Sequence, residues 1–233
     1  MKNIINHIIK SIAGFVLLFN ILALLWVLLY MVIPVPVTKL MLIEGQDKEI
    51  KYEWKSIEEI SGKLQLAVMC AEDQYFLLHE GLDFRSIREA EEANRRGANV
   101  RGASTITQQV AKNVFLWPDR TYARKAAELY FSLLIEMVWS KERIMEVYLN
   151  VAEFGNGIFG AEAASQAYFK KPAIDLTTTQ AARLAAILPS PKRYSATAPG
   201  PYVQRRVDWI TTQMKYWGYE MTYDPEFVKK MVL

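Results

Sequence analysis

The apolar residues of the chain are concentrated in one long N-terminal run. Residues 12–33 contain no charged side chain, and Asn20 is the only strongly polar one. As a helix this run would span about 33 Å, close to the thickness of the hydrocarbon core of a bilayer. A cleaved signal peptide is the alternative, but its apolar core would be shorter, and residues 34–37 (PVPV) offer no small-x-small cleavage site. The pattern predicts a short cytoplasmic segment over 1–11 and an uncleaved transmembrane helix over 12–33.

Helix signals dominate the remainder, which divides into a predicted linker over 34–55 and one domain over 56–233. Capping residues precede periodic apolar runs, and proline or glycine follows them. A glycine cluster at 155–160 predicts a turn. No alternating pattern is long enough for a sheet, so the predicted fold class is mostly α, with a single N-terminal transmembrane helix. The predicted helices run from Thr105 to Pro118, Thr121 to Trp139, Ser140 to Val151, Ala161 to Phe169, Thr177 to Leu188 and Tyr202 to Trp217.

Composition removes several classes of protein. The 28 basic and 25 acidic side chains give a net charge of +3, which is too small to indicate nucleic-acid binding. Cys70 is the only cysteine, and His7 and His79 are the only histidines. An internal disulfide and a thiolate zinc site are therefore excluded, and no metal site built from protein ligands is expected. Basic residues stand on both sides of the apolar run, so charge counting does not settle its orientation.

The first group of residues that could carry chemistry is the acidic pair Glu72 and Asp73, which lies within apolar sequence. Two adjacent carboxylates are costly to bury unless they are paired or one is protonated. A carboxyl in an apolar cleft tends towards a raised pKa, which suits a general base. The alternative is an exposed helix turn with two solvated acids. His79, two turns further on, is expected to be a packed or hydrogen-bonding side chain.

The second group is a basic strip over residues 101–125. Its local charge is +4, more than the +3 of the whole chain, and hydroxyl and amide side chains are interleaved with it. Such a surface suits a phosphate or diphosphate, although a solvated basic face has the same composition. The basic side chains are Arg101, Lys112, Arg120, Arg124 and Lys125, and the hydrogen-bonding ones are Ser104, Thr105, Thr107, Gln108, Gln109 and Asn113.

The third group centres on Glu128, within residues 126–139, a predicted helix that is apolar on nearly every side. Such a helix is expected to be central to the domain, so the acid needs a partner. Arg124 at i−4 and Lys125 at i−3 are close enough to supply one. Without further context, a structural buried ion pair is the simpler interpretation.

Taken together, these residues resemble the peptidoglycan glycosyltransferases, glycosyltransferase family fifty-one, and in particular the monofunctional biosynthetic transglycosylases of Gram-negative bacteria. One departure is visible in a further motif, at residues 180–191: Gln180 stands where the family usually has an acid. Because Gln completes a capping box with Thr177 as well as Glu would, the change is expected to be structurally neutral. The resemblance covers about residues 60–195, with five motifs in order: 72–81 (E-D-x-x-F-x-x-H-x-G), 101–113 (G-x-S-T-I-T-Q-Q-x-x-K-N), 124–128 (R-K-x-x-E), 141–150 and 157–169.

The resemblance implies a lysozyme-like helical domain that polymerises lipid II into β-1,4-linked glycan strands, with inversion at the anomeric carbon and release of polyprenyl diphosphate. It implies Glu72 as general base and Glu128 as second catalytic acid, with Asp73 supporting Glu72. Lys112 and Arg120 resemble diphosphate ligands, with Arg124 and Lys125 beside them. The remaining residues expected to line the substrate groove are Ser104, Gln108, Gln109 and Asn150.

The implied partners are lipid II, the growing glycan strand, the cytoplasmic membrane and other cell-wall synthesis proteins. The expected location is the bacterial inner membrane, with one pass and the catalytic domain on the periplasmic side. A divalent cation (Mg or Mn) carried by the substrate diphosphate is left open. A lysozyme-like glycan-cleaving enzyme is one alternative, but it would not need the basic strip. A non-catalytic membrane scaffold is another, which the intact Glu72, Lys112, Arg120 and Glu128 argue against.

Overall fold

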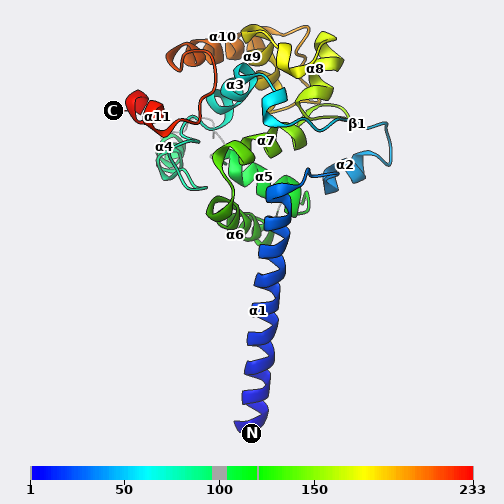
Figure 1. The fold of residues 1–233 in the computed structure, drawn as a ribbon, viewed down its shortest axis with the longest axis vertical. Helices are drawn as coiled ribbons and strands as arrows, with labels where there is room; N and C mark the ends of the chain where they lie inside the picture. The colour runs from blue at the N-terminus through cyan, green and yellow to red at the C-terminus, as the bar shows by residue number, and fades with distance from the viewer. Residues whose placement is uncertain (1, 96–103, 120, 233) are drawn as a thin grey trace. The chain divides into compact units, whose positions relative to one another are not determined.

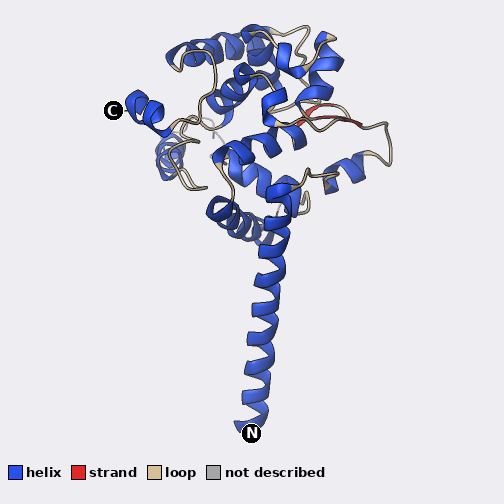
Figure 2. Ribbon diagram, in the orientation of Figure 1, coloured by secondary structure: helices blue, strands red, loops and turns tan. Residues whose placement is uncertain are grey.

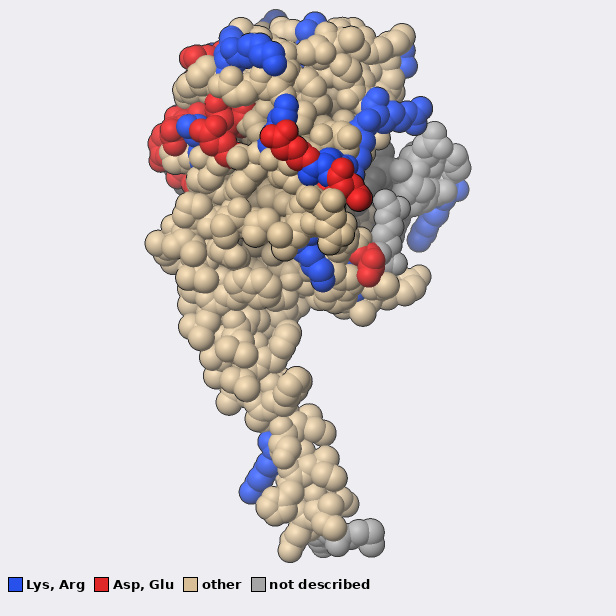
Figure 3. Space-filling model, turned by 90° about the vertical axis from the view of Figure 1, so that its right-hand side faces the viewer, with Lys and Arg blue, Asp and Glu red and all other residues tan. Residues whose placement is uncertain are grey.

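The computed structural model describes residues 2–95, 104–119 and 121–232, and the chain forms two compact units, Met1–Pro34 and Val35–Leu233. The first unit is a single helix, α1 (Lys2–Val32), which is long and apolar enough over Asn3–Val32 to span a membrane. Its surface in Figure 3 is uncharged apart from basic side chains near its N-terminal end. Asn20 donates a 2.8 Å hydrogen bond to the backbone oxygen of Val16, so its polar group is satisfied within the helix. These properties are consistent with a membrane anchor.

The second unit is built almost entirely of helices, with one small sheet (Figures 1 and 2), and the predicted mostly α fold class is confirmed. Its first elements are α2 (Lys39–Glu44), β1 (Lys51–Tyr52), the 3-10 turn η1 (Ile57–Glu59), α3 (Gly62–Glu72) and α4 (Phe84–Arg95). The middle of the unit holds α5 (Ile106–Phe115), α6 (Tyr122–Val138), α7 (Lys141–Val151), β2 (Glu153–Gly155), β3 (Ile158–Phe159) and α8 (Ala161–Phe169). The last elements are the 3-10 turn η2 (Ala173–Asp175), α9 (Thr178–Ile187), α10 (Pro201–Tyr216) and α11 (Pro225–Val232).

Local capping interactions define the ends of several helices. At the start of α5, the Thr105 hydroxyl accepts from the Gln108 backbone N–H at 3.2 Å, and the Gln108 side chain accepts from the Thr105 N–H at 3.1 Å. Thr177 and Gln180 form the same reciprocal pair at the start of α9. The capping role predicted for Gln180 is thus confirmed. Gly218, with φ of 81°, ends α10 in the left-handed conformation, which lets two backbone N–H groups bond back to the last turn.

The core is organised around α3, which packs against α9 and α10, while α5 packs against α6 and α7. Every residue of α3 from Leu64 to Cys70 is buried, so this helix is enclosed on all sides. The expectation that the helix carrying Glu128 would be central is wrong. The side chains of Leu129, Leu133 and Met137 on α6 are 38%, 46% and 78% exposed, and α6 lies at the edge of the unit (Figure 1).

The glycine cluster forms a hairpin, and the expectation that no sheet would form is wrong. β3 pairs antiparallel with β2 and parallel with β1, in the order β1-β3-β2. The strands are two or three residues long, too short for an alternating pattern to show in the sequence. Gly157 has φ of 72°, and a Cβ there would lie 2.8 Å from the backbone oxygen of Glu49. The segment 34–55, predicted as a linker, contains α2 and β1.

Candidate active site

Glu72 is the last residue of the buried helix α3, and it bonds to a residue of the wall of a cleft that it does not itself line. Its side chain is half-buried, and its Oε2 accepts a 2.9 Å hydrogen bond from Nε2 of Gln109 on α5. Burial raises the pKa of the Glu72 carboxyl, and the Gln109 bond and the positive charge of Arg206 partly oppose that rise. The carboxylate is therefore held in place as a hydrogen-bond acceptor while having the raised proton affinity that suits a general base.

Asp73, the residue after Glu72, is bonded through its carboxylate to α5 and His79. Its carboxylate is buried, accepts the backbone N–H of Ile106 at 2.9 Å and contacts Nε2 of His79 at 2.9 Å. An acid at the first N–H of α5 is favoured by the helix dipole, so Asp73 joins the end of α3 to the start of α5. Its negative charge also contributes to the raised pKa of Glu72. Asp73 faces the protein interior, and His79 is a packed hydrogen-bonding partner, as expected from the sequence.

The cleft beside Glu72 has a volume of about 340 Å³ and is lined by polar and cationic side chains of α5, α6 and the segments before them. Gln109 belongs to its wall and so connects the cleft to Glu72. Arg101 and Arg120 of the basic strip lie outside the described residues. The lining residues are Leu40, Ser104, Gln108, Gln109, Lys112, Asn113, Leu116, Pro118, Arg124, Lys125 and Glu128.

The charges of both candidate catalytic acids, Glu72 and Glu128, act on the Lys112 ammonium. Burial lowers the pKa of its ammonium, while the charges of Glu128 and Glu72 both act to raise it. Among the described residues its ammonium makes neither a hydrogen bond nor an ion pair within contact distance. Lys112 is thus a partly desolvated cation in the cleft wall, available to an anionic ligand.

Glu128 is buried and fully engaged by two cations from its own helix. Arg124 donates to its Oε2 and Lys125 to its Oε1, so the partners predicted from the i−4 and i−3 spacing are confirmed. Lys125 also donates to the Ser104 hydroxyl at 3.3 Å. Because both carboxylate oxygens are occupied, Glu128 holds the two cationic side chains against the cleft wall.

Two further residues expected in the substrate groove have structural bonds instead. The Gln108 side chain lines the cleft but is buried, and its oxygen caps α5. Asn150 is absent from the cleft lining: its amide donates to the backbone oxygens of Lys55 and Glu146 and accepts the Lys55 N–H, each at 2.8 Å. Asn150 therefore fixes the segment before η1 onto α7.

Two residues next to the site were missed by the sequence analysis. The buried Tyr148 on α7 donates from its hydroxyl to Oε1 of Gln109 at 3.4 Å. Arg206 on α10 donates from Nη2 to the backbone oxygen of Ala71 at 2.5 Å, next to Glu72. Tyr148 lies within the fourth motif (141–150), so the sequence pointed to its segment. Arg206 lies after the last motif, and no sequence pattern pointed to it. Within the described ranges, no three His, Cys, Asp or Glu side chains are grouped as metal ligands.

Comparison with known proteins places this fold and site in a class. Residues 39–215 match the family described as Transglycosylase. A "Biosynthetic peptidoglycan transglycosylase" of Xanthomonas campestris is 53% identical over 169 residues, covering 72% of this chain and 69% of that protein. Proteins of the same name from Xanthomonas euvesicatoria and Pseudomonas aeruginosa are 46% and 51% identical, covering 87% and 74% of this chain and 85% and 74% of their own lengths.

A helical domain that matches this family model and these relatives defines a glycosyltransferase of cell-wall synthesis. The chain belongs to the transglycosylase family and is a peptidoglycan glycosyltransferase. The resemblance inferred from the five motifs is confirmed, and the relatives come from Gram-negative bacteria, as predicted.

Proposed function

We propose that the protein polymerises lipid II by a single inverting displacement in which Glu72 is the general base. The observation that carries this proposal is the hydrogen bond to Glu72 from Gln109, which lines the same cleft as Lys112, Arg124 and Lys125. A base beside a cationic wall is the arrangement that transfer from a sugar diphosphate requires.

In the proposed step, the 4-hydroxyl of the incoming lipid II attacks C1 of the muramic acid at the end of the growing strand. Glu72 takes the hydroxyl proton as the new C1–O bond forms. The bond from C1 to the diphosphate oxygen breaks, and its electron pair leaves with the polyprenyl diphosphate. Attack from the face opposite the leaving group turns an α-linked diphosphate into a β-1,4 bond.

The cationic residues would stabilise the departing diphosphate. Lys112 supplies a partly desolvated charge, which interacts more strongly with an anion than a fully hydrated one. Glu128 forms ion pairs with Arg124 and Lys125 and so orients them. Among the described residues it forms no ion pair with Lys112, whose charge stays available to the diphosphate. Arg120 is proposed as a further ligand from the motif alone. Since the oxygens of Glu128 are already occupied, a divalent cation would be carried by the substrate diphosphate.

We further propose that α1 crosses the cytoplasmic membrane once and that the second unit lies on the periplasmic side. A polyprenyl chain stays in the bilayer, so an anchored enzyme remains close to its substrate. Protease added to spheroplasts should then degrade the second unit without cell lysis. Protection of this unit until lysis would contradict the orientation.

The test of the reaction is polymerisation of labelled lipid II by the full chain in detergent, beside Glu72→Gln. We expect lysozyme-sensitive strands from the wild type and none from the variant. Glu220→Gln makes the same isosteric change at an exposed site and should keep full activity.

Other outcomes would separate the alternatives. Activity in Glu72→Gln would support the proposed reaction but would show that Glu72 is not the general base. Shortening of purified glycan strands, without polymerisation, would identify a glycan-cleaving enzyme. Lipid II binding by the folded wild type without turnover would identify a scaffold.

A further inference from the structure

α10 carries a row of exposed aromatic side chains. Tyr202, Trp209 and Tyr216 are 50%, 37% and 68% exposed. They follow one another at intervals of seven residues, about 10.5 Å along a helix, and seven residues are almost two turns, so the three lie on one face. We call these three residues the aromatic row. The opposite face of α10 is buried and consists of Val203, Val207, Ile210 and Met214.

The aromatic row lies beside the segment that carries Glu72. Arg206 and Gln213, on the same face of α10 as the row, bond to the residues on either side of the base. Arg206 donates to the Ala71 oxygen at 2.5 Å, and the Gln74 amide donates to Oε1 of Gln213 at 3.3 Å. Figure 1 shows α10 above α3, with α5 and α6 below it, and α10 packs on α3 and α9. Glu72 therefore stands between the cationic cleft and the aromatic row.

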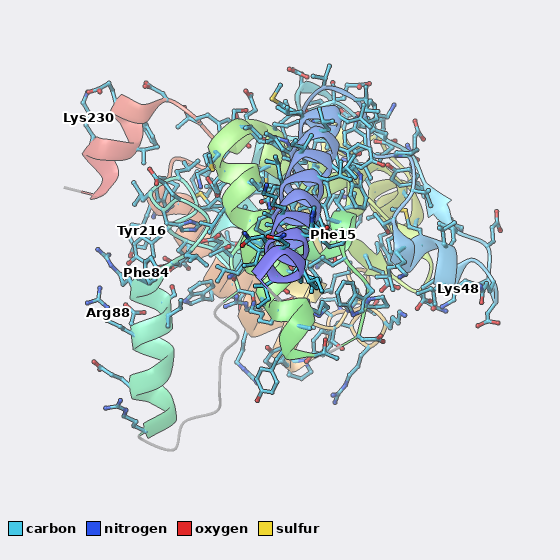
Figure 4. The ribbon with its side chains drawn as sticks, turned by 90° about the horizontal axis from the view of Figure 1, so that it is seen from below. Phe15, Lys48, Phe84, Arg88, Tyr216 and Lys230 are labelled. Atoms are coloured by element: carbon cyan, nitrogen blue, oxygen red, sulfur yellow. The ribbon has the colours of Figure 1, made fainter. Side chains whose placement is uncertain are left out.

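Two of the three rings of the row are held in place by neighbours. The guanidinium of Arg206 lies 4.4 Å from the centre of the Trp209 ring, and the Tyr202 ring stacks on Tyr194 at 5.3 Å. Figure 4 labels Tyr216 on the side of the unit where α4 and α11 also lie. Fixed rings lose little conformational entropy when a ligand packs on them.

Aromatic rings flanked by guanidinium and amide groups match the chemistry of a β-linked sugar chain. Each pyranose presents apolar C–H faces, which pack on flat rings, and equatorial hydroxyls, which bond to planar polar side chains. The row is about 21 Å long from Tyr202 to Tyr216. This exceeds the disaccharide of a single lipid II, so the row fits a polymer rather than the acceptor.

We infer that the aromatic row binds the growing glycan strand where it leaves the reacting centre. The inference rests on the proposed function, in which the diphosphate of the strand occupies the cationic cleft and its sugars extend past Glu72. A strand held along α10 stays bound between additions. The row therefore determines how many sugars are added before the product dissociates.

Strand length tests this role. Full-length wild type, Trp209→Ala and Tyr216→Ala are given labelled lipid II, and both the initial rate and the length of the strands are measured. We expect strands several-fold shorter from both variants when length is compared at the same amount of lipid II consumed. Trp209→Phe keeps a flat ring and should restore length, whereas Trp209→Leu should not. Tyr122→Ala removes a tyrosine that is 98% exposed on α6, outside the row, and should leave length unchanged.

Binding provides a second readout that does not depend on turnover. Full-length Glu72→Gln protein is titrated with purified uncross-linked glycan strands, with and without Trp209→Ala. We expect the second substitution to weaken binding about five- to tenfold. Unchanged length and affinity in Trp209→Ala would overturn the inference, as would equal shortening by Tyr122→Ala. Absence of polymerisation by the wild type would instead overturn the proposed function, and the glycan titration would still test the row.

Discussion

Gln109 donates a 2.9 Å hydrogen bond from Nε2 to Oε2 of Glu72, and its Oε1 accepts from the Tyr148 hydroxyl at 3.4 Å. The phenol therefore fixes which end of the amide faces the base. With the NH₂ group towards Glu72, the ionised carboxylate is favoured; with the oxygen towards it, the protonated acid would be favoured. A buried tyrosine on α7 thus influences the charge of a glutamate at the end of α3.

The pH dependence of the wild type should show the raised pKa of Glu72. A general base acts when deprotonated, so kcat/KM for lipid II should fall as the pH is lowered through that pKa. Since burial raises it, the fall should occur above the ordinary carboxyl value of 4.5. The measurement is a profile of initial rates at low lipid II concentration. A midpoint at or below 4.5 would contradict the assignment of Glu72 as a buried base.

Tyr148→Phe should move this fall of kcat/KM at low pH, the acid limb of the profile, to higher pH. Without the hydroxyl, the Gln109 amide can turn its oxygen towards protonated Glu72, which stabilises the neutral acid. The expected shift is about 0.5–1 pH unit, the equivalent of one modest hydrogen bond. Tyr223→Phe is the matched control, because that half-buried phenol also donates to a glutamine oxygen, on Gln65 at 3.0 Å. Equal shifts in both variants would show a general effect of losing a phenol.

If Tyr148→Phe does not yield folded protein, Gln109→Met can carry the same test. It removes the acceptor of the phenol and the donor to Glu72 together, so the acid limb should move in the same direction and further. An unmoved limb would show that the amide does not influence the charge of the base.

Lys112 should determine the alkaline limb of the same profile. Its charge is needed for the diphosphate, and burial lowers its pKa from 10.5, so kcat/KM should fall as the pH rises through the lowered value. Lys112→Ala should cost about 10²-fold or more in kcat/KM. Lys112→Arg keeps a charge at all accessible pH values, so any activity it retains should lack this alkaline fall. Lys215→Ala, an exposed lysine on α10, is the control, and an identical alkaline limb in Lys112→Arg would exclude Lys112 as its source.

Asn150→Ala should affect stability rather than substrate binding. It removes two hydrogen bonds between α7 and Lys55 and a third to Glu146 within α7, with an expected loss of about 2–4 kcal/mol in the free energy of unfolding. KM for lipid II, measured at a temperature where the variant is folded, should stay near the wild-type value. Thermal unfolding and initial rates on the same preparation check both statements. A raised KM at unchanged stability would indicate that Asn150 contacts the substrate instead.

The features that sequence determined here are local along the chain. The capping pairs of α5 and α9, the glycine that ends α10 and the apolar run of α1 depend on residues a few positions apart. The pairing of Glu128 with Arg124 and Lys125 belongs to the same group, because helical geometry alone brings i−3 and i−4 neighbours together. The motifs added the reaction class, since their order matches a family whose chemistry is shared.

Tertiary structure decided which distant residues meet. Glu72 and Gln109 are 37 residues apart, and Ala71 and Arg206 are 135 apart. No local periodicity specifies such pairs, because they depend on how α3 packs against its neighbours. The same holds for the short parallel pairing of β1 with β3, and for α3 rather than α6 being central. The sequence by itself therefore determined α1, the helices from α5 to α10, their caps and the class of chemistry. Long-range packing alone placed Glu72 between a cationic cleft and an aromatic row, and it also decided α2, α3, α4 and α11, which the sequence did not predict.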